Sequence, residues 1–198
     1  MGLDWNNADG QTPLEEEEKE GLLIPSIATR GELDEFEHQN IERAIQWTLT
    51  RSFPAQIIFT ADFVQLLHRK MFADVWKWAG EFRNTNKNIG KDKLTIPTEL
   101  RYLLDDAQFW VNNAAYTPDE IAIRFKHRLV NIHCFPNGNG RHSRLMADII
   151  IEKIFKLPVF SWGGRNTGIL TDIRATYLTA IKLADRGDYH SLLAFARS

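Results

Sequence analysis

Residues 133–144 read His-Cys-Phe-Pro-Asn-Gly-Asn-Gly-Arg-His-Ser-Arg. A histidine, a glycine-rich turn and two arginines fall within these twelve residues, and phosphate chemistry uses all three. The imidazole of His133 can accept or donate a proton near neutral pH. This stretch is therefore typical of a loop that handles the phosphates of a nucleotide.

The turn and the arginines suit an anion for separate reasons. Gly138, Asn139 and Gly140 can direct backbone N–H groups toward one point, because glycine tolerates left-handed conformations. Arg141 and Arg144 are three residues apart and would share one face of a helix that begins in the turn. The first turn of that helix would add its own free N–H groups and the positive end of its dipole.

Helices are predicted on both sides of the loop. Thr117-Pro118-Asp119-Glu120 is a capping box, which predicts a helix over 118–132 that ends at His133. Apolar spacing predicts another helix over about 140–156. Caps and apolar periodicity predict the remaining helices over 13–21, 32–50, 61–76, 97–113, 169–185 and 188–197.

Residues 82–96 interrupt this helical pattern. Asn, Gly and Lys separate short apolar pieces there, which predicts a hairpin or an irregular flap. No internal repeat or linker divides the chain. We therefore expect one domain over 1–198, all-α with one small β-hairpin flap.

Composition limits the classes of protein. At 198 residues with 43% hydrophobic side chains, the chain can bury the core of a single globular domain. A net charge of −2 gives no bias toward nucleic acid or an anionic membrane, so we expect neither as a direct partner. The single Cys134 excludes an internal disulfide, and no apolar run approaches the roughly 20 residues of a membrane helix. A cytoplasmic protein is expected.

The stretch 133–144 resembles the signature of the Fic (Fic/Doc) family, His-x-Phe-x-(Asp/Glu)-Gly-Asn-Gly-Arg-x-x-Arg. Asn137 is the one departure from it. Residues 78–83, 96–97 and 184–195 also resemble the family, so the likeness extends over most of the chain. The layout is similar to that of a small Fic group named mobile mystery protein B. The resemblance implies the mainly helical Fic fold.

It also implies a reaction, the transfer of AMP from ATP to a Ser, Thr or Tyr hydroxyl of a target protein. His133 would deprotonate the hydroxyl, which then attacks the α-phosphate and displaces pyrophosphate. Gly138, Asn139 and Gly140 would cradle the α- and β-phosphates. The β- and γ-phosphates would pair with the two arginines of the signature, Arg141 and Arg144.

Several further roles follow from the resemblance. Asn137 stands where a carboxylate usually holds Mg²⁺; an amide oxygen can still be a ligand but brings no charge. The flap over 82–96 would align a target segment as an added strand. Glu20 is the candidate inhibitory glutamate, expected to pair with Arg144, although a plain solvated helix fits the acidic run equally well.

Tyr177 and Asp185 are the candidates for the adenine pocket. Phe135 is expected to anchor the loop by burial. A zinc site made by His127, His133 and His142 is disfavoured, because their spacing does not place them on one helical face.

Two other functions stay open at this point. One is phosphotransfer of the Doc type, in which the nucleotide binds reversed and its γ-phosphate moves; Asn137 keeps this open. The other is a non-catalytic module that binds a nucleotide or a companion protein. The mobile mystery protein B resemblance implies a mobile element and a small companion DNA-binding protein, in a pair similar to a toxin and its antitoxin.

Overall fold

Helices make up nearly all of the regular structure in the computed structural model, which describes residues 19–164 and 170–198. In chain order the elements are α1 (Arg30–Leu49), α2 (Ala55–Ile58), α3 (Ala61–Phe72), the 3-10 turn η1 (Lys93–Thr95), α4 (Ile96–Asn112), α5 (Pro118–Ile132), α6 (Asn139–Ile149), the π-helical turn η2 (Ile150–Ile154), α7 (Leu170–Ala184) and α8 (His190–Arg197). The all-helical prediction is confirmed, whereas the helix expected over 13–21 lies mostly outside the described residues.

Side-chain caps set where most of these helices begin. The Thr117 hydroxyl accepts from the backbone N–H of Glu120 at the start of α5, as its capping box predicts. Thr60 caps α3 in the same way. The start of α1 comes two residues earlier than expected, because Thr29 and Glu32 form a reciprocal capping box.

The end of α3 and the presence of α2 also differ from the sequence prediction. α3 ends at Phe72 rather than near Trp76, because the chain after it pairs with the N-terminal turn: Leu22 and Trp76 form an antiparallel bridge, and the Lys77 N–H donates to the Gly21 carbonyl. The single turn α2 after Pro54 was not predicted, since four residues are too few for an apolar period to show.

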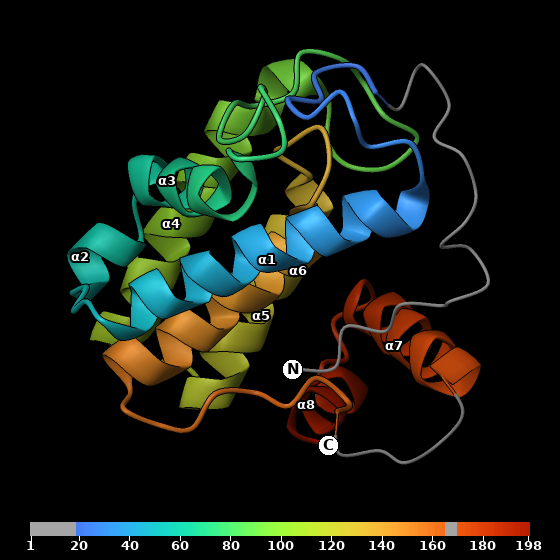
Figure 1. Cartoon of the computed structure of the whole chain (residues 1–198). Helices are drawn as coiled ribbons and strands as arrows, with labels where there is room; N and C mark the ends of the chain where they lie inside the picture. The colour runs from blue at the N-terminus through green and yellow to red at the C-terminus, as the bar shows by residue number, and fades with distance from the viewer. Residues whose placement is uncertain (1–18, 165–169) are drawn as a thin grey trace.

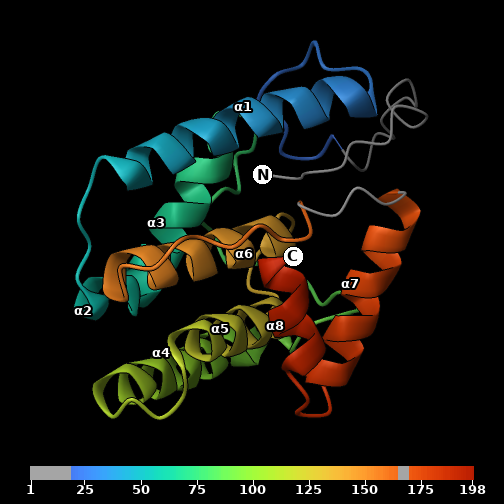
Figure 2. The ribbon, with the colours of Figure 1, turned by 90° about the horizontal axis from the view of Figure 1, so that it is seen from below.

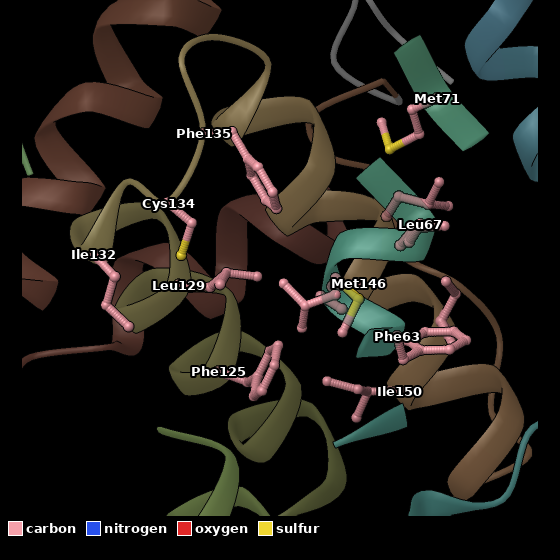
Figure 3. Packing of buried hydrophobic residues seen from close by; sticks show 14 of the residues in the cluster. Phe63, Leu67, Met71, Phe125, Leu129, Ile132, Cys134, Phe135, Met146 and Ile150 are labelled. Atoms are coloured by element: carbon pink, nitrogen blue, oxygen red, sulfur yellow. The ribbon is translucent and has the colours of Figure 1, made fainter. Parts of the chain in front are cut away.

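The helices are arranged in layers around α6. Figures 1 and 2 show α1 lying over α3 and α6, with α4 and α5 on the opposite side. α7 and α8 form a hairpin at one end of these layers (Figure 2), and α8 reaches α5. Figure 3 shows the resulting core, where side chains of α3, α5 and α6 meet; its labelled residues include Leu67, Phe125, Leu129 and Met146, all buried. The signature loop connects the two central helices, α5 and α6.

The flap over 82–96 does not form the predicted β-hairpin. It has no paired strands and is an irregular loop up to η1. The backbone N–H groups of Arg83 and Lys91 donate instead to the carbonyls of Cys134 and Ile132, at the start of the signature loop. The backbones of the two arms of the flap therefore pair with the loop rather than with each other.

Along the described residues, no helix has both the length and the apolar character needed to cross a bilayer.

Candidate active site

His133 ends α5 in a left-handed conformation, with φ 59° and ψ 59°. Its backbone N–H still bonds to Leu129 O of the last turn, so the reversal directs the chain from the helix into the loop. Left-handed backbone is uncommon outside glycine, and it gathers at functional sites. The imidazole is half-buried, and this burial is the main cause that lowers its pKa below the ordinary histidine value; Arg83 and Lys87 lower it further. The ring is therefore neutral at pH 7 and can accept a proton.

The loop after His133 is held by buried side chains. Phe135 is fully buried and stacks on His68 with ring centroids 3.7 Å apart, which confirms it as an anchor. The Asn139 side chain brackets the Phe135 backbone: its Oδ1 accepts from the N–H at 2.9 Å, and its Nδ2 donates to the carbonyl at 2.8 Å. Asn139 can thus contribute only its backbone N–H to a phosphate, because its amide is committed to the loop.

Gly138 has a shaping role in this turn. Its φ is +76°, and a Cβ there would lie 2.5 Å from the Phe72 ring. The Gly138 N–H donates to Oδ1 of Asn137 at 2.7 Å, so this backbone N–H is not available to bind an anion. Gly140 differs, because nothing lies within 4 Å of the place where its Cβ would stand. The N–H groups available to an anion are therefore those of the first turn of α6, beside the open space at Gly140.

Two neutral histidines support the loop from inside. The Gly80 N–H donates to Nδ1 of His68, so Nε2 carries the proton and donates to the Asn137 carbonyl at 3.1 Å. His142 donates from Nε2 to Val64 O at 3.0 Å, and burial lowers its pKa to about 3. These contacts account for both imidazoles, and no cluster of metal-binding residues occurs in the described parts of the chain.

A pocket of about 210 Å³ opens over the loop, and it gathers most of the predicted site. Its lining residues are His133, Asn137, Gly138, Asn139, Gly140, Arg141 and Arg144. Among the described residues, the lining contains two guanidinium groups and a helix N-terminus but no carboxylate, so the charge on these walls favours an anion. An imidazole able to accept a proton thus lies against a pocket suited to phosphate.

The two arginines are held in different ways. Arg141 pairs with Glu37 of α1, with Nη1 2.5 Å from Oε2, and its guanidinium lies over the Phe72 ring. Glu37 is 3% exposed, and its other oxygen accepts from the Trp76 indole at 2.6 Å. Arg144 lies against Tyr177, with its guanidinium carbon 5.8 Å from the ring centroid.

Sequence reasoning missed Glu37, although a signal was present. Glu37 is four residues after Leu33 and four before Ile41, so it lies within the apolar stripe of α1. A charged residue in such a stripe is buried, and a buried carboxylate requires a partner. Arg83 was also missed as a site residue, although its Nε donates to the His133 carbonyl.

The two adenine-pocket candidates are placed apart from each other. Tyr177 lies beside Arg144 and accepts a hydrogen bond from Lys126 at 2.5 Å. Burial, aided by Arg144, lowers the pKa of this lysine to about 7. Asp185 instead accepts from His127 and Asn131, which ties the end of α7 to α5. Neither Tyr177 nor Asp185 lines the phosphate pocket.

Glu20 lies in a turn and is exposed. It lines a larger cavity of about 710 Å³ together with Arg30, Lys77 and Asn137, rather than the phosphate pocket that contains Arg144. The described contacts of the signature arginines include a different glutamate, Glu37, which pairs with the first of them. An inhibitory role for Glu20 stays a prediction.

The residues present do not fit a magnesium ion held by the protein. Magnesium favours carboxylate ligands, and the described residues that line the pocket supply none. The Oδ1 of Asn137 already accepts from Gly138.

Comparison with known proteins agrees with this geometry. Residues 58–151 match the family model described as Fic/DOC family. The chain is 30% identical over 133 residues to Protein adenylyltransferase Fic of Drosophila grimshawi, covering 65% of this chain and 26% of that protein. It thus spans about a quarter of the length of this curated relative.

Two solved structures share the fold. Fic-1 (aa134–508) from C. elegans has a TM-score of 0.66 at 21% identity, covering 90% of this chain and 51% of that one. The BepC protein of Bartonella tribocorum, with bound AMPPNP, has a TM-score of 0.66 at 17% identity and covers 92% and 97%. With its signature loop and its match to the family model, the part of the chain over residues 58–151 is a Fic/DOC family domain.

Proposed function

We propose that this protein transfers AMP from ATP to a hydroxyl side chain of a target protein. The observation that carries the proposal is the neutral imidazole of His133 on the wall of a pocket that also holds Arg141 and Arg144. A base and an anion site are the two parts that nucleotidyl transfer to a hydroxyl requires. The name of the Drosophila grimshawi relative, Protein adenylyltransferase Fic, supports this reading.

The chemistry can be written with the groups of the pocket. His133 takes the proton of the target hydroxyl, and the oxygen attacks the α-phosphorus of ATP. A new O–P bond forms while the bond from the α-phosphorus to the oxygen bridging it to the β-phosphorus breaks, and pyrophosphate leaves with that electron pair. Arg141, Arg144 and the first N–H groups of α6 stabilise the negative charge that moves onto the leaving group. The products are a protein–AMP phosphodiester, pyrophosphate and a proton on the imidazole.

Other parts of the proposal concern ligands and partners. The triphosphate would bring its own Mg²⁺, held mainly by phosphate oxygens. Tyr177, beside Arg144, is the better placed of the two adenine candidates. The flap over 82–96 would align the target segment next to His133. A cytoplasmic location and a companion DNA-binding protein are supported by the sequence resemblance alone.

Intact-mass analysis after incubation with magnesium and ATP tests the proposal, first on the protein itself and then on proteins of a bacterial lysate. The matched variant is His133→Asn, because asparagine tolerates left-handed backbone but has no imidazole. An AMP-sized adduct that forms with the wild type and is lost in His133→Asn is expected. A phosphate-sized adduct would instead establish the Doc-type reaction. ATP binding without any adduct, on either set of proteins, would contradict AMP transfer.

A further inference from the structure

Arg83 joins the flap to the backbone of His133. Its side chain is 3% exposed, and its guanidinium donates to three carbonyls. Nε donates to His133 O at 2.6 Å, Nη1 to Thr85 O at 2.7 Å, and Nη2 to Lys91 O. Among the described residues these three carbonyls are its hydrogen-bond acceptors. A buried cation is costly unless its donors are satisfied, so the three bonds hold the side chain in one place.

Gly90 brings the other arm of the flap against the same histidine. Its φ is +95°, and a Cβ there would lie 2.5 Å from the Cβ of His133. The N–H of the next residue, Lys91, donates to Ile132 O, the carbonyl just before the histidine. The flap backbone thus touches the Cβ of His133 and the carbonyl just before it, and only a residue without a side chain fits there.

The flap is stiff enough to transmit this contact. Asn86 bridges it internally, donating to the Asp92 carboxylate at 2.9 Å and accepting from the Lys93 N–H at 2.8 Å. The Lys93 ammonium donates to Asn84 O at 2.7 Å. Side-chain hydrogen bonds thus join the two arms of the flap to each other, and backbone hydrogen bonds join both arms to the signature loop. The flap cannot move without losing several of these bonds.

We propose that Arg83 and Gly90 are positioning residues: the base of the flap holds His133 in its left-handed turn and so aims the imidazole into the phosphate pocket. The inference rests on the proposed role of His133 as the base. It gives the flap a second task besides the alignment of a target, because a disturbance of the flap backbone would reach the reacting group through Arg83 and Gly90. Such a disturbance would move the imidazole of His133, which is the proton acceptor, and would leave the anion site at the start of α6 in place.

Gly90→Ala tests this, with Gly187→Ala as its matched control. Gly187 has a similar φ of +90° but nothing within 4 Å of its Cβ position, so it has the backbone strain without the clash. Ordinary contact begins at 3.4 Å, and the 2.5 Å approach at Gly90 therefore forces a shift of about 1 Å. A misplacement of that size can lower kcat by about 10²-fold. We expect that loss in Gly90→Ala, with KM for ATP unchanged and with Gly187→Ala close to the wild type.

Two readouts keep the result decisive. If Gly90→Ala and Gly187→Ala have the same kcat, the positioning role is overturned. If the wild type transfers no AMP at all, the proposed function fails, and the NMR signal of the His133 imidazole decides the inference instead. A signal moved in Gly90→Ala but not in Gly187→Ala supports positioning, and an unmoved signal refutes it. Should Gly90→Ala not fold, Arg83→Lys gives the same two readouts, because lysine keeps the charge but cannot bond to three carbonyls in one plane.

Discussion

Replacing Glu37 by glutamine should destabilise the free protein and at the same time raise its affinity for a nucleoside triphosphate. Glu37 is 3% exposed and uses both oxygens, one on Arg141 and one on the Trp76 indole. Glutamine keeps the shape and an acceptor oxygen but removes the charge. The Arg141 guanidinium then loses the carboxylate that pairs with it, and among the described residues no carboxylate lines the pocket to replace it.

The size of the effect follows from the burial of the two partners. Removing one partner of a fully buried ion pair costs about 3–5 kcal/mol. The Arg141 side chain is 18% exposed and can draw on solvent, so we expect about 2–3 kcal/mol. For a chain of 198 residues this lowers Tm by about 5–10 °C. A triphosphate then meets an un-neutralised cation, and we expect its Kd to fall about tenfold, equivalent to about 1.4 kcal/mol.

Thermal unfolding with and without ATP, together with calorimetric titration, measures both effects. Glu35→Gln is the matched control, because it makes the same substitution two residues earlier on α1, at an exposed side chain. A Glu37→Gln variant that is less stable and binds ATP no better than the wild type would refute the reasoning. Glu37 would then orient Arg141 for phosphate binding rather than compete with the phosphate for the guanidinium.

Three further predictions concern single groups. Asn137→Asp should lower the Mg²⁺ concentration for half-maximal activity about tenfold, since it adds a charged ligand beside the phosphates while keeping an acceptor for Gly138; an unchanged Mg²⁺ titration would count against a metal near this position. The acid limb of the pH–rate profile should lie below the ordinary histidine range and move upward in Lys87→Met, because Lys87 helps to lower the pKa of His133; a limb that does not move would argue against His133 as the group that titrates. Burial raises the pKa of Asp148 to about 7, so the folded state binds more protons than the unfolded state between the ordinary carboxyl value and pH 7, and stability falls as pH rises across that range. Asp148→Asn keeps an acceptor for the Phe160 N–H, so urea unfolding should show the slope, at most about 1.4 kcal/mol per pH unit, reduced in the variant; an unchanged slope would assign it to other groups.

Local signals in the sequence were enough for most of the fold. Thr60 and Thr117 marked helix starts because a cap acts within three residues of itself. The pocket lining could also be predicted, since His133 and the arginines of the signature are close in sequence and are brought together by a single loop.

Long-range contacts explain what the sequence did not reveal. Glu37 meets Arg141 from a helix about a hundred positions earlier, and its charge suggests solvent until its place in an apolar stripe is considered. The carbonyl partners of Arg83 lie 2, 8 and 50 positions away, and backbone carbonyls carry no mark of residue type. The flap was predicted as a hairpin because its turn residues are visible in the sequence, whereas its pairing with Cys134 and Ile132 is not.

The place of Glu37 on α1 also says how large a working fragment must be. The family match begins at residue 58, downstream of this helix, so a fragment cut to the match would lose the carboxylate that pairs with Arg141 and bonds to Trp76. It would also uncover the face of α3 on which α1 lies. A minimal expression clone that preserves the nucleotide site should therefore start upstream of Thr29, whose hydroxyl caps the N-terminus of α1.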